Sequence, residues 1–242
     1  SGPRRLWGAD EGLRPDSRIV TLYFDRHGQL WIGRNGLGAA QLVSERWRHR
    51  AYWSGTERQV PGETVFAITP TADGSVLAAV FSRGIWKWDG ERVTEIGRAR
   101  GLTENVRTAV EPSPGVLWAG GRFGLYESLA GGPFRRVLAL PSGFVTGLRR
   151  GPDGTWYALT SVAGIWARRN GVWAAETAIN SQLPHQGVRD LRWMRNGDQW
   201  IATAAGVAVV SQGRARTLHG AGEPGAVTTN AILELQNGEV WV

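Results

Sequence analysis

The sequence predicts an all-β fold, a β-propeller of four-stranded antiparallel blades, and three observations support this prediction. A polar-Gly turn before an apolar or Trp-containing strand recurs at Gly28, Gly74, Gly115, Gly154, Gly197 and Gly238. These glycines are 46, 41, 39, 43 and 41 residues apart, a length that four short strands fill. The 13 Trp and 34 Gly suit aromatic strands joined by tight turns. No segment keeps a helical apolar period without a Gly or Pro break, which excludes helical repeats.

Each repeat is expected to contain four strands in a fixed order. In the first repeat an alternating strand at residues 19–24 precedes the turn at Gly28, and the second strand carries Trp31. A second glycine opens the third strand of each repeat, at Gly38, Gly84, Gly124, Gly164 and Gly206. The fourth strands are predicted at residues 47–53, 93–96, 134–137, 172–175 and 215–218.

The repeats are expected to form a single propeller domain over residues 1–242. Five repeats are complete and the sixth is partial, with approximate bounds 12–56, 57–98, 99–139, 140–178, 179–219 and 220–242. The segment Arg4 to Trp7 resembles an outer strand, so the two ends of the chain are expected to share the last blade, which leaves no open sheet edge. Two interpretations stay open: a fragment of a seven-bladed ring, or a six-bladed ring with an incomplete last blade.

The composition limits the chemistry and suggests an acidic partner. The net charge is +7, and Lys87 is the single lysine among 28 basic residues. The planar guanidinium of Arg pairs with carboxylate, phosphate or sulfate groups. The arginines are spread over every repeat without forming a basic stripe, so no nucleic-acid partner is expected. The absence of Cys excludes disulfides, Cys-ligated zinc and thiol nucleophiles. The sequence contains neither an 18-residue apolar stretch nor an N-terminal signal peptide.

A tryptophan recurs on the second strand of most repeats, and we interpret it as structural. Trp31, Trp118, Trp156, Trp200 and Trp241 mark this position. The second repeat has Leu77 in its place, and in the fourth repeat the Trp is shifted by one residue. A large ring at this position is expected to fill the wedge between adjacent sheets.

The candidate ligand-binding residues lie where the repeats differ. The loop between the second and third strands and the loop before the first strand both open on one face of a propeller, around the central channel. In the first three repeats the former loop contains Arg34 and Asn35, then Ser82 and Arg83, then Arg122 and Phe123; the fourth and fifth have Thr160, Ser161 and Thr203. The loops before the first strand add Arg18, Asn105, Arg107, Gln186 and Arg189. These donors predict a site for an acidic small molecule or saccharide, the alternative being ordinary exposed loop residues.

No residue pattern predicts catalysis, a metal site or a cofactor. His27, His49, His185 and His219 fall at unrelated positions of the repeat, whereas metal ligands should converge from equivalent positions. His185 alone precedes a channel-face loop, where it could serve as a general base. Hydrolase, P-loop and dinucleotide-binding motifs are absent from the sequence.

The repeats resemble those of a known family, most closely in the first, third and fifth. The first, Gly12-Leu13 followed by RIVTLYFDRHGQLWIGRNGLGAAQL, and the third, GLTENVRTAVEPSPGVLWAGGRFGLYESL, resemble the repeat of the two-component regulator propeller family. The resemblance implies a periplasmic sensor domain of a membrane-anchored bacterial receptor, which binds an oligosaccharide or similar ligand and acts as a dimer.

Two further function classes stay open beside the sensor. The Gly-x-x-Trp hairpin is also similar to that of streptogramin lyases, so a lyase is the alternative function if the protein is an enzyme. A protein-interaction scaffold is the third class, since a fold does not fix a function.

Overall fold

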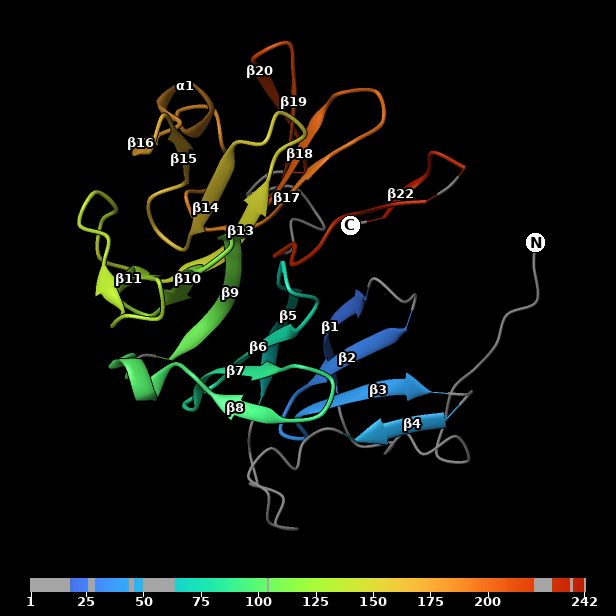
Figure 1. Ribbon diagram of the computed structural model, residues 1–242. Helices are drawn as coiled ribbons and strands as arrows, with labels where there is room; N and C mark the ends of the chain where they lie inside the picture. The colour runs from blue at the N-terminus through green and yellow to red at the C-terminus, as the bar shows by residue number, and fades with distance from the viewer. Residues whose placement is uncertain are drawn as a thin grey trace. The chain divides into compact units, whose positions relative to one another are not determined.

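The computed structural model describes residues 18–25, 29–43, 46–49, 64–103, 105–219, 228–235 and 237–241. These residues form five four-stranded sheets and one two-stranded sheet (Figure 1). Helical structure in this part of the chain is confined to a 3-10 turn, Arg98–Arg100, and the single turn α1, Thr177–Asn180. The predicted all-β propeller architecture, with five complete blades and a partial sixth, is therefore confirmed. The features expected at Arg4 to Trp7, Gly12-Leu13, Gly28 and residues 50–53 lie outside the described residues.

The chain forms two compact units. Unit 1 comprises Ser1–Ala119 and Glu127–Arg135, and unit 2 comprises Gly120–Tyr126 and Arg136–Val242. The division runs through the third four-stranded sheet. The single domain over residues 1–242 and the closure of a ring stay predictions.

Blades 1 and 2 belong to unit 1, and their strands follow one another in sheet order. Blade 1 consists of β1 Ile19–Phe24, β2 Leu30–Arg34, β3 Ala39–Val43 and β4 Arg46–His49. Blade 2 consists of β5 Val65–Pro70, β6 Val76–Val80, β7 Gly84–Trp88 and β8 Val93–Glu95. The strand predicted at 19–24 is confirmed.

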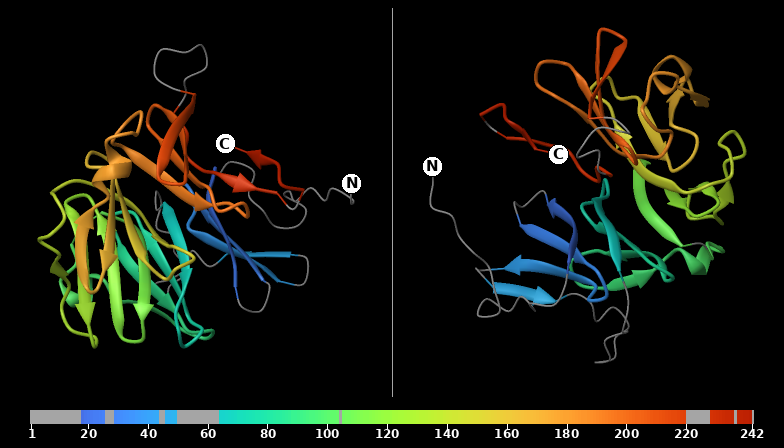
Figure 2. Two further views of the ribbon diagram at one scale, coloured as in Figure 1. Left: turned by 90° about the horizontal axis from the view of Figure 1, so that it is seen from above. Right: turned by 180° about the vertical axis from the view of Figure 1, so that it is seen from behind.

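The remaining sheets follow the same plan. Blade 3 consists of β9 Val106–Ser113, β10 Val116–Gly121, β11 Gly124–Leu129 and β12 Arg135–Arg136. In unit 2, blade 4 consists of β13 Val145–Arg150, β14 Trp156–Thr160, β15 Ile165–Arg169 and β16 Val172–Ala175. Blade 5 consists of β17 Val188–Trp193, β18 Gln199–Thr203, β19 Gly206–Ser211 and β20 Arg214–His219. The partial sixth blade pairs β21 Leu233–Glu234 with β22 Val240–Trp241. Figure 2 shows blades 4 and 5 side by side within unit 2.

The recurrent glycines supply backbone conformations that other residues rarely adopt. At the hairpin turns φ is +83° at Gly74, +77° at Gly115, +83° at Gly154, +87° at Gly197 and +83° at Gly238. The glycines that open the third strands also have positive φ: Gly38, Gly84, Gly124, Gly164 and Gly206. An L side chain at positive φ is strained, so these positions favour glycine. The repeat in the sequence is thus a repeat of turn geometry.

The strand register decides which aromatic residue occupies the wedge position. In blade 1 Trp31 pairs with Tyr23, the second-last residue of β1, and only 1% of its surface is exposed. The residues at the same register position in blades 2 and 5 are Leu77 and Trp200. In blade 4 the position belongs to Tyr157, which is buried, whereas its neighbour Trp156 is half-buried.

The assignment of Trp156 to the core position is therefore wrong by one residue. Successive side chains of a strand point to opposite faces, so a shift by one residue moves the ring to the other face. Tyr157 instead contacts Trp193 of blade 5, with ring centroids 5.1 Å apart. Trp31 and Trp118 are buried as predicted, whereas Trp241 in β22 is 60% exposed.

Alanine substitutions at the two neighbouring positions of β14 test this register. Tyr157→Ala is expected to lower the free energy of unfolding by about 3 kcal/mol, because it empties a buried site between two blades. Trp156→Ala should cost clearly less, although it removes the larger ring. Urea unfolding followed by circular dichroism measures both, and a larger loss for Trp156→Ala would contradict the register.

Adjacent blades approach closely at one glycine of unit 1. A Cβ atom on Gly33 would lie 2.6 Å from the backbone oxygen of Val65 and 2.5 Å from Cγ2 of Thr21. Backbone atoms cannot move aside cheaply, so glycine is required where β2 meets β5. Side chains also join blades: in equivalent positions Glu111 accepts a hydrogen bond from the Ala72 N–H and Glu234 accepts one from the Arg195 N–H.

The first and last described sheets expose apolar side chains. On β1, Leu22 is 63% and Phe24 is 65% exposed, and on β21, Leu233 is 58% exposed. The residues equivalent to Leu22 in blades 2, 4 and 5, which are Ile68, Leu148 and Leu191, are buried. The exposed Leu22 therefore marks a face of β1 that is covered in the other blades.

Candidate ligand-binding site

A bulge at the start of the innermost strand displays one side chain in each of blades 1, 2, 4 and 5. The pairing register shifts between Ile19 and Thr21, between Val65 and Ala67, between Val145 and Gly147, and between Val188 and Asp190. The bulged residues are Val20, Phe66, Thr146 and Arg189, and Arg107 holds the corresponding second position of β9. Bulges redirect a side chain out of the regular pattern, and they are frequent beside functional sites.

In unit 1 two of these side chains, Phe66 and Arg107, lie beside Phe81 of the β6–β7 loop, and we call the three residues the aromatic-arginine cluster. The guanidinium carbon of Arg107 lies 4.9 Å from the centroid of the Phe66 ring. The Phe66 ring meets Phe81 edge to face, with centroids 5.8 Å apart, and Phe81 is 38% exposed. The cluster thus combines an exposed aromatic edge with a cation held over a ring.

Thr64 connects two loops beside this cluster. Its hydroxyl donates to Oδ1 of Asn35 at 2.6 Å and accepts from the Gly36 N–H at 3.4 Å, while its carbonyl accepts from the Phe81 N–H at 2.8 Å. The predicted residue Asn35 is therefore exposed at the edge of this site, on a loop that is tied to the β6–β7 loop. The β6–β7 loop also carries the predicted residue Arg83, whose side chain is half-buried.

Arg34 has a different environment from the one expected of a ligand-binding arginine. It is the last residue of β2, only 1% of its surface is exposed, and Nη2 donates to the Leu37 carbonyl at 2.7 Å. Thr160 and Thr203 occupy the same register position, and their hydroxyls donate to the carbonyls of Gly164 and Gly206. At this position the side chain therefore holds the turn into the third strand. Arg34 was expected in the loop between the second and third strands, but it is the last residue of β2, whereas Arg83 and Arg122 lie in those loops as expected.

In unit 2 the predicted residues lie in two separate places. Arg122 and Phe123 are exposed in the β10–β11 loop, and the Arg122 guanidinium lies 5.4 Å from the Phe123 ring centroid. Arg189 is half-buried in its bulge, and Nη1 donates to Oδ1 of Asn230 at 3.3 Å. Each unit thus contains an arginine paired with a phenylalanine near its predicted loops.

The sequence interpretation missed Phe66 and Phe81. Both are aromatic residues at positions where the repeats differ. At the position of Phe66, for example, the other blades have Val20, Arg107, Thr146 or Arg189, so the sequence contained this signal. The recurrent Trp positions drew the aromatic interpretation to the core instead.

One nitrogen of His185, the candidate general base, already accepts a hydrogen bond from its own loop. His185 is exposed, and its Nδ1 accepts a hydrogen bond from the Gly187 N–H at 2.7 Å, so it shapes its own loop. His27 and the side chains of His49 and His219 lie outside the described residues. Within the described part of the chain no three His, Cys, Asp or Glu side chains gather in a possible metal site. None of the helical segments described is long and apolar enough to cross a membrane.

The fold of the described residues is that of a β-propeller, and comparisons with solved structures agree with this class. No protein-family model and no curated protein matches the sequence. Solved structures do match. The extracellular domain of the hybrid two component system BT3049 from B. thetaiotaomicron has a TM-score of 0.61 at 14% identity, covering 98% of this chain and 40% of that one.

Propellers of other kinds are similar as well. The WD40 propeller domain of Doa1 has a TM-score of 0.57 at 16% identity, covering 80% of this chain and 64% of that one. The computationally designed protein Ika8 has a TM-score of 0.59 at 14% identity, covering 92% and 69%. The chain spans about two fifths of the length of the BT3049 domain. The resemblance to two-component regulator propellers is thus confirmed at the level of the fold.

Proposed function

We propose that the chain is a ligand-binding propeller of a bacterial signal-transduction receptor, located outside the cytoplasmic membrane, and that it binds an acidic saccharide. The resemblance of the first and third repeats and the fold of the BT3049 extracellular domain support the sensor role. The observation that carries the ligand class is the aromatic-arginine cluster of unit 1.

The cluster combines the two groups that a uronic acid needs. The exposed edge of Phe81 and the ring of Phe66 offer an apolar surface for the carbon face of a sugar ring. Arg107 places a guanidinium beside that surface, and guanidinium groups bind carboxylates through two parallel hydrogen bonds. Asn35 and Arg83, on the two loops joined by Thr64, supply further donors.

The predicted residues of unit 2 extend the same chemistry. Arg122 and Phe123 form a second arginine-aromatic pair, and Arg189 lies beside Asn230. We propose that these residues of unit 2 bind the same class of ligand, independently of the cluster in unit 1.

Calorimetric titration with an oligogalacturonide and with its neutral counterpart, the fully methyl-esterified oligogalacturonide of the same length, tests this function. We expect the acidic sugar to bind more tightly, and Arg107→Ala to weaken that binding about 10- to 100-fold, as expected for a lost charged hydrogen bond. Arg107→Lys keeps the charge but cannot form two parallel hydrogen bonds to a carboxylate. Its affinity for the acidic sugar should lie between those of the unsubstituted protein and Arg107→Ala.

Arg216→Ala is the matched control, because it removes the same charge from an exposed position on β20. It should leave the affinity unchanged. The proposal fails if no acidic glycan binds, or if an Arg83→Ala, Arg107→Ala double variant keeps full affinity. A protein partner captured without any small-ligand binding would favour the scaffold class instead.

A further inference from the structure

The sequence contains four Asn-Gly pairs, and the structure places one of them in surroundings that differ from those of the others. The four asparagines are Asn35, Asn170, Asn196 and Asn237. An asparagine before a glycine can deamidate, because the backbone nitrogen of the glycine attacks the side-chain amide and glycine has no side chain to hinder the attack. The surroundings of each pair therefore decide which asparagine reacts first.

Two of the pairs lie in turns between the first and second strands of a blade, where both reacting groups are hydrogen-bonded. The side-chain oxygens of Asn196 and Asn237 each accept a hydrogen bond at 3.0 Å from the backbone N–H two residues further on. The N–H of the glycine after each asparagine donates to a backbone carbonyl, that of Met194 at 2.9 Å and that of Leu235 at 3.0 Å. Attack by either glycine nitrogen would first break a hydrogen bond of the turn.

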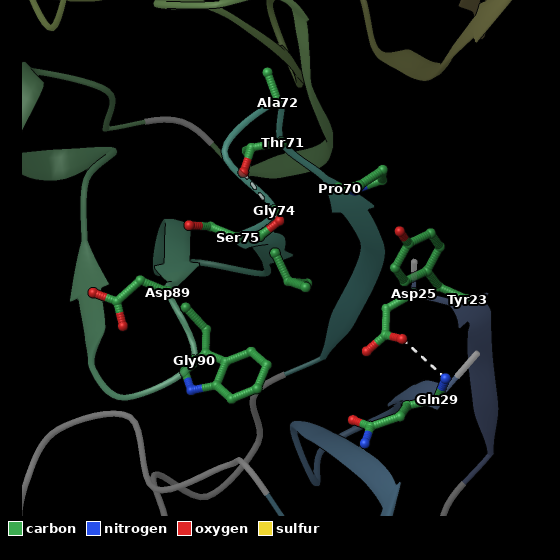
Figure 3. Close-up of a pocket in the computed structure, with 12 residues that line it drawn as sticks. Tyr23, Asp25, Gln29, Pro70, Thr71, Ala72, Gly74, Ser75, Asp89 and Gly90 are labelled. Carbon is green, nitrogen blue, oxygen red and sulfur yellow. Dashed lines mark hydrogen bonds between the residues drawn. The ribbon is translucent and has the colours of Figure 1, made fainter. Parts of the chain in front are cut away.

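Other hairpin turns are restrained in similar ways. Figure 3 includes the equivalent turn of blade 2, Thr71 to Ser75, at the edge of a pocket, and its Gly74 N–H likewise donates to the Thr71 carbonyl at 3.0 Å. Asn170 and Gly171 form the two-residue turn between the paired strands β15 and β16, with φ of +50° and +80°. The strands on either side hold this turn in place.

The surroundings of Asn35 are more open. Asn35 lies in the β2–β3 loop and is exposed, so that water reaches its side-chain amide. A Cβ atom on Gly36 would have no neighbour within 4 Å. The Gly36 N–H lies 3.4 Å from the hydroxyl oxygen of Thr64, which is long for a hydrogen bond. The attacking nitrogen is thus weakly held, and the space around it is free.

The hydroxyl of Thr64 contacts both groups that would react. It donates to Oδ1 of Asn35 at 2.6 Å and accepts from the Gly36 N–H. Only 8% of the surface of Thr64 is exposed, so packing fixes the hydroxyl in this position. A donor on Oδ1 stabilises the negative charge that develops there when the amide carbon is attacked. The same hydroxyl oxygen can take up the proton of the Gly36 nitrogen.

We propose that Asn35 is a modification site, at which the fold promotes deamidation. The Gly36 nitrogen forms a bond to Cγ of Asn35, and its proton is passed on through the Thr64 hydroxyl. The bond between Cγ and Nδ2 breaks, and Nδ2 leaves with that proton as ammonia, so that a succinimide ring remains. Water then opens the ring at either of its carbonyls and leaves aspartate or isoaspartate at position 35. The reaction consumes only water.

The product carries a carboxylate where the protein has a neutral amide. Thr64 links Asn35 to the β6–β7 loop, at the edge of the aromatic-arginine cluster. Deamidated protein should therefore bind the oligogalacturonide about 2- to 5-fold more weakly, because the new charge repels an acidic ligand. This consequence rests on the proposed function, whereas the deamidation itself requires no ligand and is measured without one.

Peptide mapping by mass spectrometry, after incubation of the 242-residue protein in mildly alkaline buffer, measures all four pairs in one sample. We expect position 35 to deamidate about tenfold faster than the other three, since their turns must first open. In urea, which removes the fold, the four rates should become similar. Equal rates in the folded protein, or a difference that persists in urea, would overturn the proposal.

Three variants test the part played by the Thr64 hydroxyl. Thr64→Val has nearly the same shape without the hydroxyl, and should slow deamidation at position 35 about tenfold. Thr64→Ser retains the hydroxyl and should retain the rate. Thr160→Val is the matched control, because it removes a buried, hydrogen-bonded hydroxyl from unit 2 and should leave position 35 unaffected. Thermal melting checks the fold of each variant. An unchanged or faster rate in folded Thr64→Val, or an equal loss in Thr160→Val, would overturn the assistance by Thr64.

Discussion

Replacement of Trp118 by alanine is expected to lower the free energy of unfolding by about 3–5 kcal/mol, the usual cost of emptying a buried Trp site. Trp118 lies in β10, and none of its surface is exposed. Its indole N–H donates to Oε2 of Glu127 at 2.7 Å. The substitution therefore leaves a cavity and removes the donor from a carboxylate on the neighbouring strand.

Two further substitutions separate the causes. Trp118→Phe keeps most of the ring but lacks the N–H, and should cost about 1–2 kcal/mol. Trp241→Ala is the matched control, because this Trp marks the same position of the sixth repeat but is 60% exposed. Its loss should stay below about 1 kcal/mol. Urea unfolding followed by circular dichroism measures all three, and similar losses for Trp118→Ala and Trp241→Ala would contradict a core role of Trp118.

The spacing of the glycines was sufficient to predict the blades. Each blade needs a backbone with positive φ at its hairpin turn and again at the start of its third strand, and glycine adopts that conformation without strain. This backbone requirement recurs in every blade, so its glycines recur at a regular spacing that is visible in a single sequence. The side chains of Arg34, Thr160 and Thr203 each donate a hydrogen bond to a carbonyl at the turn into the third strand. Because a guanidinium and a hydroxyl fill the same role, the sequence alone does not show that these positions are equivalent.

The register of β14 could not be predicted from composition. Trp156 and Tyr157 are adjacent aromatic residues, and either suits the wedge between sheets. The bulge between Val145 and Gly147 and the pairing of Tyr157 with Arg149 decide that Tyr157 faces blade 5. In the same way, Phe66 reaches Arg107 because neighbouring blades bring the second residues of β5 and β9 together. The loops of the site were predictable, but the partners of each side chain depend on packing between blades.

Replacement of Asp190 by alanine should be the second large loss of stability. Only 2% of Asp190 is exposed. Its Oδ1 accepts from Nε and Nη2 of Arg149 at 2.9 and 2.8 Å, and its Oδ2 accepts from Nε of Arg192 at 3.0 Å and from the Ile232 N–H at 3.2 Å. One carboxylate thus joins the innermost strands of blades 4 and 5 to the segment before β21.

We expect Asp190→Ala to cost about 2–4 kcal/mol, because the Ile232 N–H stays buried without its acceptor and two cations lose their counter-charge. The cost stays below that of a fully buried pair, since the side chains of Arg149 and Arg192 are 30% and 51% exposed and water can solvate them. Asp190→Asn keeps an oxygen for the Ile232 N–H and should be milder than Asp190→Ala.

Glu234→Ala provides the comparison for Asp190. Glu234 also joins blade 5 to the sixth blade, but it is half-buried and accepts one hydrogen bond, from the Arg195 N–H at 3.1 Å. Its removal should cost about 1 kcal/mol or less. Equal losses for the two alanine variants in urea unfolding would mean that burial and the two arginines add nothing at Asp190. A larger loss for Asp190 would show that charges one repeat apart in the sequence stabilise the contact between blades.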